Sequence, residues 1–547
     1  MKRRDFIKAI GAVGTAALVQ PESVLARARQ KRAAYFNLHP FVAAHPEAVF
    51  VKTTAVPTKT DVAAKRQASL DLARELFVGS AESGISINSR IAIKPNLTCG
   101  GSARTDEMGI ITDADFVEGF IEGMKELGLR GEQFYLREGN MLGDAYCPNS
   151  ESAAWYRPMA ERTGAHLYDL DSGRALADAS LANLEEGAEV IWREVPNGVI
   201  FQRIGYVAPI NADDAWSLNI AKFKAHGMGL TLCTKNWQGT NVHPYIHYCE
   251  DLSKLVRNKS ASFVDDVNPQ FMELVTQRHA QHLEEGVPRW DRPGSTWNSG
   301  WGMEGWAQKT LDNLAASRHG LSVIEGIYGR NGNGFTQGPG AGGKAQDFMT
   351  NMVVFGRNPI KTDIIGHWLG GHEPGNFGLF HAALDRGLTD TVDPRAIPIY
   401  SWENGQPLRR TLDEFTRYPL STYYLKRDYD GQDEAHFHMV DEPYTYAVPT
   451  AVRAETQIRP QSSVLGQNYP NPFNSTTVIE YQLPQRGAMR LEVFDVHGQV
   501  VDVLVDGVQA SGSHVAAWDS GHRASGTYFY RFSSEGFVET RKMVLLR

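Results

Sequence analysis

Short apolar runs alternate with longer segments of helical periodicity between about residues 49 and 390. In residues 62–77 the apolar positions recur at the spacing of one helix face, and residues 91–93 form a compact apolar run that predicts a buried strand. Residues 116–127 predict the next helix. Because strands that alternate with helices are typical of mostly parallel sheets covered on both faces, we expect an α/β fold with a Rossmann-like sheet core.

The periodicity changes after about Thr456, where short runs of alternating apolar and polar residues follow one another at roughly ten-residue spacing. Gly, Asp or Asn separates most of these runs. The predicted strands are residues 477–483, 489–494, 500–505, 514–518, 528–532 and 540–546. This pattern predicts a small C-terminal antiparallel β-sandwich of the immunoglobulin-like kind.

Polar residues follow five predicted strands of the middle region at the point where each strand ends. These exits are residues 94–96, 138–140, 224–227, 325–326 and 356–359. Because ligands of such sheets bind outside the carboxyl ends of the strands, we expect the exits to surround one site. Asn358 and Pro359 form a favourable helix start, so we expect the N-terminus of the following helix, which contains Asp363, at the same edge.

Lysines are prominent among the exit residues, and they suit a carboxylate or phosphate group on a substrate. The candidate substrate-binding residues are Lys94, Asn96, Lys224, Asn236, Asn333, Gly334 and Asp363. The candidates for catalysis are His226, Glu325 and Lys235, as groups that move protons or polarise the substrate. Arg357 is a further candidate cation. The alternative is that these cations form structural ion pairs with nearby carboxylates.

The densest His/Cys cluster lies between residues 226 and 249. Its candidate metal ligands are His243, His247 and Cys249, because imidazole and thiolate are ligands that Zn²⁺ prefers. A disulfide between two of the four cysteines and ordinary packing remain alternatives. The cofactor is therefore open, with a transition metal such as Zn²⁺ among the choices. On the predicted helix 269–285, we expect His279 and His282 to be solvated.

Two segments predict long loops. Residues 290–306 hold four tryptophans among Gly and Pro, which suits either a planar ligand such as a sugar or simple packing of a loop. Residues 338–345 have the glycine and lysine spacing of a phosphate-binding loop. However, Ala345 lacks the hydroxyl that would hold Mg²⁺, so we interpret this segment as a loop closing over the site together with residues 331–334.

The first residues have the layout of a signal peptide. Arg3 and Arg4, followed by Phe and Ile and then Lys8, resemble the twin-arginine export motif, whose pathway carries folded proteins. The apolar stretch that follows is about eleven residues long, against roughly 20 for a helix that spans a bilayer, so we expect no stable transmembrane anchor. A small-x-small site at residues 26–28 predicts cleavage there.

The composition is that of a soluble globular protein, with 42% apolar and 22% charged residues over 547 positions. The net charge is −8, from 55 basic and 63 acidic residues, and loss of the signal peptide takes it to about −11. No basic block lies beyond the first residues, so we expect no nucleic-acid partner.

The middle region resembles the family called domain of unknown function 362. The matching segments are residues 94–97, 220–226, 234–236 with Gly239, 325–327, 332–334 and 356–363. At the C-terminus, residues 465–474, 526–528 and 542–544 closely resemble the type A sorting domain of the type IX secretion system. This second resemblance implies passage across the outer membrane of a Gram-negative cell, followed by release or surface attachment. The implied partners are the twin-arginine and type IX export machineries.

We therefore expect four parts: a signal peptide (residues 1–28), an α/β core (29–455), a linker (456–466) and a sorting β-sandwich (467–547). The favoured function is an exported enzyme that acts on an anionic small molecule at the carboxyl edge of the sheet, with or without a metal. The alternative is a non-catalytic surface protein that binds an anion or a glycan. A single pocket that brings Glu325 and His226 together would favour the enzyme.

Overall fold

The computed structural model describes residues 34–97, 108–138, 152–169, 190–226, 229–241, 267–291, 293–294, 299–332, 344–422, 443–446, 463–468, 471–484, 487–509 and 512–546. The predicted signal peptide lies outside these ranges. So do the candidate metal ligands His243, His247 and Cys249 and the candidate binding residues Asn333 and Gly334. Among the described residues, no helix has both the length and the apolar character needed to cross a membrane.

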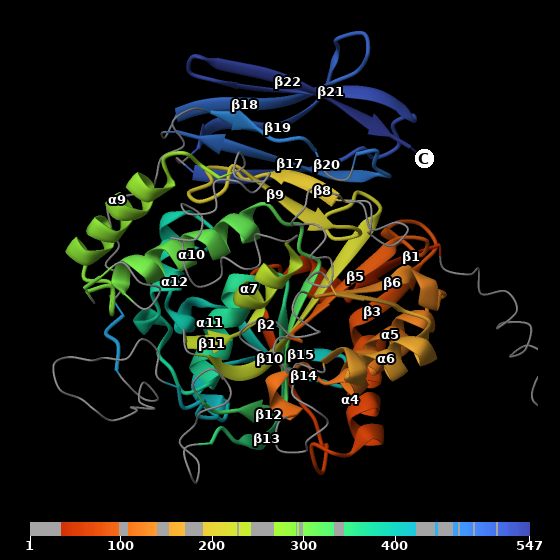
Figure 1. Cartoon of the computed structure of the whole chain (residues 1–547). Helices are drawn as coiled ribbons and strands as arrows, with labels where there is room; N and C mark the ends of the chain where they lie inside the picture. The colour runs from red at the N-terminus through yellow and green to blue at the C-terminus, as the bar shows by residue number, and fades with distance from the viewer. Residues whose placement is uncertain are drawn as a thin grey trace, which may run out of the picture.

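A ten-stranded sheet forms the centre of the α/β unit (Figure 1), in the order β15-β14-β2-β13-β12-β10-β5-β6-β7, with β11 paired to β10. Its strands are β2 (Val49–Thr53), β5 (Arg90–Pro95), β6 (Phe134–Glu138), β7 (His166–Asp169), β10 (Ala215–His226), β11 (Gly229–Thr231), β12 (Leu321–Arg330), β13 (Asp347–Gly356), β14 (Ile399–Glu403) and β15 (Gln406–Arg410). Strands β7, β6, β5, β10 and β12 run parallel to one another. The sheet is mixed but mostly parallel, which confirms the predicted α/β class.

The direction of β13 corrects one prediction. This strand is antiparallel to both of its neighbours, β12 and β2, and Gly356 at its end lies opposite Ser322 at the start of β12. Arg357 and Asn358 therefore lie at the amino edge of the parallel strands, away from Lys94 and Lys224. The prediction of a helix N-terminus at the carboxyl edge is wrong, because an apolar run does not encode the direction of its strand.

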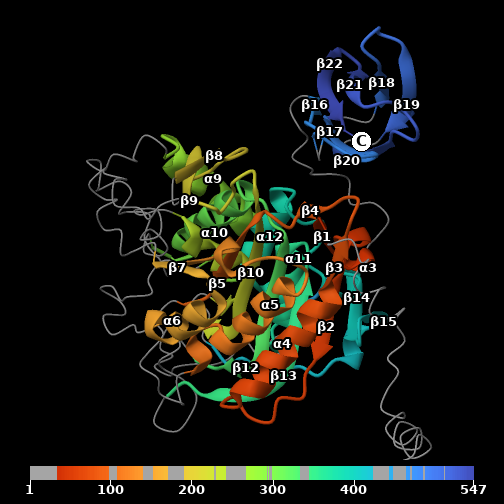
Figure 2. The ribbon, with the colours of Figure 1, turned by 90° about the vertical axis from the view of Figure 1, so that its right-hand side faces the viewer.

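Helices cover both faces of the sheet (Figures 1 and 2). They are α3 (Pro40–Ala44), α4 (Val62–Leu76), α5 (Ala114–Lys125), α6 (Ser152–Thr163), α7 (Cys233–Asn236), α9 (Phe271–Glu284), α10 (Gly300–Ala315), α11 (Pro359–Leu369) and α12 (Gly378–Asp385). On β12, Val323 belongs to the core under α4, α5 and α6, whereas its neighbour Ile324 belongs to the core under α10, α11 and α12. The alternation of side chains along each strand thus supplies two apolar layers.

Side-chain caps fix the helix starts that the sequence predicts. Asp61 accepts a hydrogen bond from the Ala64 amide at the start of α4, and Asp113 does the same for α5. Ser299 caps α10, so the second half of the tryptophan-rich segment is helical. The prediction of a loop throughout residues 290–306 is therefore wrong, because a capping serine and later apolar residues outweigh the glycines.

Smaller strands complete the chain. β1 (Tyr35–Leu38) pairs with β3 (Phe77–Ser80) and β4 (Ile85–Ser86), and β8 (Val190–Glu194) pairs with β9 (Arg203–Val207). The C-terminal strands are β16 (Val464–Leu465), β17 (Thr476–Leu483), β18 (Gly487–Phe494), β19 (Val500–Gln509), β20 (Gly512–Asp519), β21 (Gly526–Ser534) and β22 (Phe537–Leu545). They form two antiparallel sheets around one apolar core that includes Leu491, Trp518 and Tyr530 (Figure 2). The predicted C-terminal β-sandwich is confirmed.

Candidate functional site

The carboxyl ends of β5, β6 and β10 bring several of the predicted binding residues together. The amide of Asn236, on the short helix α7, is the centre of this group. Its Oδ1 accepts hydrogen bonds from Lys94 Nζ at 3.0 Å and from Asn96 Nδ2 at 3.1 Å. Its Nδ2 donates to Asn219 Oδ1 on β10 at 2.8 Å, so Asn236 ties the two neighbouring strands together. Sequence positions that are about 140 residues apart thus meet at one edge.

Lys94 is buried, with 1% of its surface exposed, and its ammonium is held by several oxygens. Besides Asn236, it donates to Glu138 Oε2 and to the Pro95 carbonyl, each at 2.7 Å. Glu138, at the end of β6, also accepts the Leu97 amide at 2.8 Å. Lys94 thus forms a structural ion pair, which was the predicted alternative to substrate binding, although it lies at the carboxyl edge.

Lys224, Lys235 and His226 lie at the same edge. The Lys224 ammonium donates to the Ile110 carbonyl at 2.6 Å. Burial lowers the pKa of Lys224 well below its usual value, and the nearby charges of Lys235, Arg330 and Lys94 act in the same direction. Burial also lowers the pKa of His226, again with help from Lys235 and Lys224. Lys235 therefore lies close enough to act on both groups, and the imidazole of His226 is neutral at pH 7.

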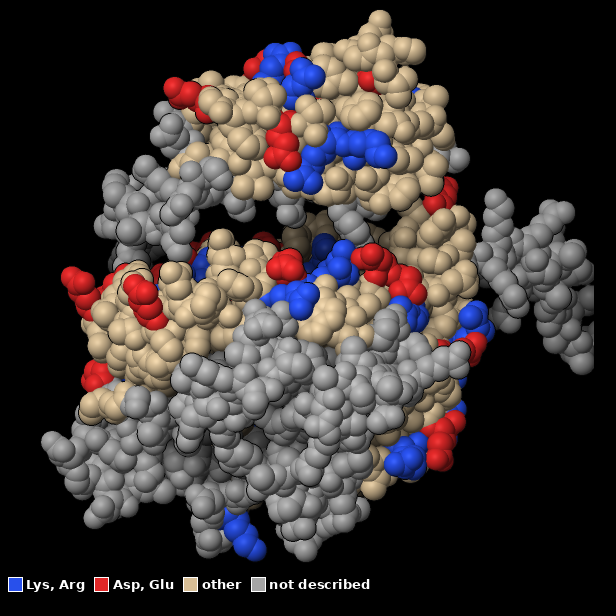
Figure 3. Space-filling model, turned by 45° about the horizontal axis from the view of Figure 1, so that its top comes forward, with Lys and Arg blue, Asp and Glu red and all other residues tan. Residues whose placement is uncertain are grey.

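These five residues define what we call the carboxyl-edge cluster: Lys94, Lys224, His226, Lys235 and Asn236. Its lysines at 94 and 224 are buried. On the molecular face in Figure 3, the described Lys and Arg side chains lie among Asp and Glu and form no single basic patch. Asn236 is buried as well, whereas His226 and Lys235 are partly exposed.

Glu325 lies in a different group of buried charges. Its Oε2 accepts from Lys222 Nζ at 2.6 Å, and both side chains are fully buried. The Lys222 ammonium also lies 3.3 Å from the centre of the Tyr328 ring. The tyrosine hydroxyl donates to Asp113, which in turn pairs with Lys65, each at 2.6 Å. We call these residues the buried ion-pair cluster.

The two candidate catalytic groups, His226 and Glu325, therefore have different electrostatic neighbours. Lys235 and Lys224 act on His226, whereas Lys222 and Asp113 act on Glu325. Burial raises the pKa of the Glu325 carboxyl, and Lys222 opposes that change. The sequence placed Glu325 after the end of a strand, but β12 continues to Arg330, so Glu325 is inside the strand. Arg330 lies at the actual end of β12 and lowers the pKa of Lys224, but it was not among the predicted site residues.

Asp363, on α11, holds the start of α7, the helix that carries two residues of the carboxyl-edge cluster. Its two carboxylate oxygens accept the amides of Cys233 and Thr234, both at 2.7 Å, at the start of α7. Burial raises the pKa of Asp363 to about 7, against the effect of these hydrogen bonds. Its contacts hold the helix that carries Lys235 and Asn236.

Gly239 shows how tightly this edge is packed. A Cβ atom at this position would lie 2.1 Å from Glu138 Oε1 and 2.9 Å from the Lys94 side chain. Only glycine lets the backbone approach the ion pair this closely. The glycine is one of the motif residues that the sequence singles out.

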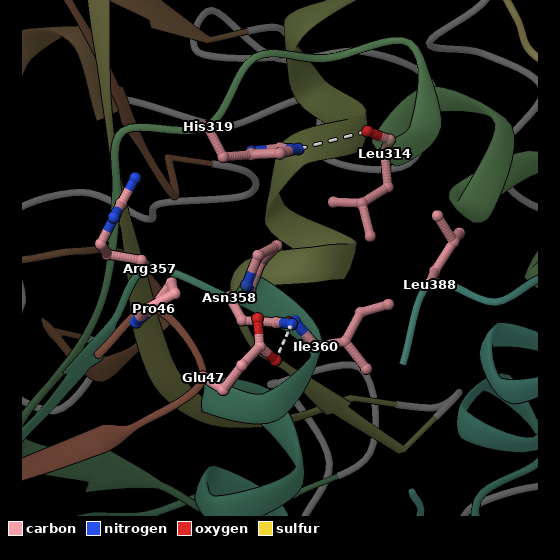
Figure 4. A pocket seen from close by; sticks show the side chains of 9 residues that line it. Pro46, Glu47, Leu314, His319, Arg357, Asn358, Ile360 and Leu388 are labelled. Carbon is pink, nitrogen blue, oxygen red and sulfur yellow. Dashed lines mark hydrogen bonds between the residues drawn. The ribbon is translucent and has the colours of Figure 1, made fainter. Parts of the chain in front are cut away.

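A hollow of about 340 Å³ lies at the opposite, amino edge of the sheet (Figure 4). Glu47, which precedes β2, and Asn358, which caps α11, line it, and the Asn358 amide donates to the Glu47 carboxylate at 3.0 Å. Nearby Lys361 contacts two carboxylates, Glu47 at 2.8 Å and Asp390 at 2.7 Å. Arg357, the predicted cation, also lines the hollow and donates to the Ala43 carbonyl at 2.9 Å.

The tryptophans offer little surface to a sugar among the described residues. Trp290 is fully buried and Trp306 is 3% exposed, so both pack in the core under α10 and α12. Trp301 is partly buried and donates to Thr276 Oγ1 at 3.1 Å. These contacts favour packing over recognition of a planar ligand.

Two family models match the chain. One, described as a domain of unknown function (DUF362), matches residues 91–367, and the other, described as a secretion system C-terminal sorting domain, matches residues 467–546. Both predicted resemblances are confirmed. The sorting domain indicates that the protein is exported to the cell surface or the extracellular space and interacts with the type IX secretion machinery. The twin-arginine signal stays a prediction.

No curated protein matches the chain at a significant level. Similar solved structures include latent PorU of Porphyromonas gingivalis, at 16% identity over 16% of this chain and 9% of that one, with a TM-score of 0.14. PorZ of the same organism is 16% identical over 15% of this chain and 11% of that one, with a TM-score of 0.12. The chain thus spans about a tenth of the length of these proteins. The Ig1 domain of mouse SynCAM 2 is 15% identical over 13% of this chain and 80% of that domain, with a TM-score of 0.10.

Proposed function

Since the chain belongs to the DUF362 family, whose description names no reaction, we propose a function from the chemistry of the carboxyl-edge cluster. The protein is an exported enzyme that acts on a small anionic molecule, which carries a carboxylate or a phosphate. The observation that carries this proposal is the convergence of Lys94 and Lys224, on adjacent parallel strands, with Lys235 on α7.

The balance of charge at this edge supports an anionic ligand. Lys235, Arg330 and Lys94 are cations that lower the pKa of Lys224, and Glu138 opposes them. Bringing a further negative charge to this place relieves the repulsion among the cations. The low-dielectric surroundings of the buried lysines make that gain larger than it would be on an open surface.

The state of His226 supports acid–base chemistry beside the anion. A neutral imidazole can accept a proton, and burial, with the charges of Lys235 and Lys224, lowers the pKa of His226 so that it is neutral at pH 7. Glu325 is engaged with Lys222 and does not share these neighbours. We therefore assign the proton-accepting role to His226 and a structural role to Glu325.

An unsatisfied acceptor at the cluster indicates a second feature of the ligand. The Oδ1 atom of Asn96 is buried and has no hydrogen-bond partner among the residues that the structure describes, while its Nδ2 donates to Asn236. Asn236 Oδ1 already accepts from Lys94, so Asn96 must present its own amide nitrogen to it and cannot be turned around. A hydroxyl or amino group on the substrate would satisfy this atom.

A ligand screen with matched lysine variants tests the proposal. Thermal unfolding of the full chain is followed with a panel of small carboxylates and phosphates, with and without hydroxyl groups. We expect at least one anion to raise the melting temperature of the parent protein. Lys235→Gln should weaken its binding by about tenfold or more, because one desolvated charge contact is worth roughly 1.5–3 kcal/mol. Lys125→Gln removes a lysine of a partly exposed pair on α5 and should leave binding unchanged.

Turnover separates the enzyme from a pure binding protein. Mass spectrometry of each bound anion after incubation should show a product with the parent protein. The His226→Gln variant should bind the anion but lose most of the product formation. A ligand that binds and is never changed by the parent protein would instead support the non-catalytic alternative. Equal affinity in parent and Lys235→Gln proteins would contradict the proposed site itself.

A further inference from the structure

The C-terminal ends of α9 and α12 meet at a group of side chains that the carboxyl-edge cluster does not use. His282 lies on α9, Glu285 directly follows the end of this helix, and Asp385 is the last residue of α12. One ligand atom from each of these three residues lies within 4.8 Å of the other two. A spacing of three residues places His282 and Glu285 on the same side of α9.

His282 is fully buried, so the prediction of a solvated side chain at this position is wrong. Its Nδ1 lies 2.5 Å from Glu304 Oε2, and its Nε2 lies 2.6 Å from Asp385 Oδ2. By contrast, Glu285 is exposed and Asp385 is partly exposed, so the group opens to solvent on the side away from Glu304.

Glu304 fixes the orientation of the histidine ring. This buried carboxylate on α10 accepts hydrogen bonds from the indole of Trp290 and from Gln308 Nε2, in addition to its contact with His282. With Nδ1 held by a carboxylate that other donors hold in place, the imidazole presents Nε2 toward Asp385. A carboxylate behind the histidine is the usual support of a metal-ligating imidazole.

The local field favours a cation. Two carboxylates, Glu304 and Asp385, face the imidazole of His282, at 2.5 Å and 2.6 Å. The negative ends of two helix dipoles add to this field. Of the nearby cations, Arg386 is paired with Asp312 at 2.8 Å, and Glu304 and Asp385 also act on Arg278.

We propose that His282, Glu285 and Asp385 bind a divalent transition-metal ion, with Zn²⁺ as the best match. One imidazole nitrogen and two carboxylates are ligands that Zn²⁺ accepts, and three protein ligands leave a position for water. When the ion binds, Nε2 releases its proton to water, and the hydrogen bond between Nε2 and Asp385 is replaced by two bonds to the metal. Glu304 stays outside the metal and keeps the ring in position.

The test is a metal titration of the full chain. Purified protein is stripped with a chelator and titrated by calorimetry with Zn²⁺ alone, and separately with Co²⁺ to record its visible absorption. We expect one equivalent to bind, with a Co²⁺ spectrum of a site that contains nitrogen and oxygen ligands. Glu285→Gln should weaken binding by about tenfold or more; because Glu285 is exposed, this variant should fold like the parent.

Glu284→Gln is the matched control. Glu284 is also exposed and directly precedes Glu285, but it is not one of the three ligands. Its variant should bind Zn²⁺ like the parent protein, and Asp385→Asn should behave like Glu285→Gln. Absence of binding by the folded parent protein, or equal affinity in the Glu285→Gln and Glu284→Gln proteins, overturns the proposal. Because the anion screen needs no metal at this position, its outcome is independent.

Discussion

Lys222 and Lys224 lie two residues apart on β10, but they belong to different clusters. Lys222 pairs with Glu325 at 2.6 Å inside the sheet, whereas Lys224 donates to the Ile110 carbonyl at the strand end. A shift in the pairing of β10 with β12 falls between the two lysines. Such an irregularity redirects a side chain, so residues of the same type on one strand reach different surroundings.

The two clusters differ in what their lysines contact. In the buried ion-pair cluster, Lys222 pairs with Glu325 and Lys65 with Asp113, so each lysine contacts a carboxylate. At the carboxyl edge, Lys94 pairs with Glu138, whereas Lys224 donates to a backbone carbonyl and has the cations Lys235, Arg330 and Lys94 among the charges that lower its pKa. The ion pairs of the first cluster hold elements together, and the gathering of lysines at the second is suited to an incoming anion.

Removal of Lys222 should lower the stability of the protein most. Lys222→Met leaves Glu325 buried without its partner, so we expect a loss of about 3–5 kcal/mol in the free energy of unfolding. Urea unfolding of the full chain measures it. The double variant Lys222→Met/Glu325→Leu should regain most of that loss, because no lone charge remains. A single variant as stable as the parent protein would show that the pair is not structural.

A second change acts on the packing of the carboxyl-edge cluster. In Gly239→Ala the new Cβ collides with the Glu138 carboxylate, so the Lys94–Glu138 pair must move. We expect a loss of about 1–3 kcal/mol in stability, as for other overpacked sites, and weaker anion binding. Gly387→Ala is the control. Gly387 has a positive φ, but an added Cβ would have no atom within 4 Å. This variant should lose about 1–2 kcal/mol in the free energy of unfolding and keep its anion binding.

The smallest expected effect is a change in titration. Burial lowers the pKa of His226, and Lys235 and Lys224 lower it further, so the imidazole gains its proton only as the pH falls below the ordinary range. In Lys235→Gln one of these causes is gone, and the pKa should rise. The imidazole proton signals of histidine-labelled protein, assigned with His226→Gln, measure it. An unchanged titration in Lys235→Gln would mean that Lys235 does not face His226.

The strand-exit rule found part of the site from sequence. It singled out Lys94, Asn96 and Lys224, which lie at the carboxyl edge, because each follows or ends a compact apolar run. It failed for Arg357, since the rule assumes that every strand runs in the same direction and β13 does not. It failed for Glu325 because β12 continues beyond the apolar run to Arg330.

The alternation of strands and helices, the C-terminal β-sandwich and the sorting signal could be predicted from the sequence alone. These features depend on spacing and motifs within short stretches of chain. The contact of Lys222 with Glu325, 103 positions away, and that of His282 with Asp385, also 103 positions away, depend on the tertiary structure. The partner of a buried charge is set by the direction of strands and the packing of helices. For this reason a lysine in the sequence gives no sign of whether it will hold the fold or receive a ligand.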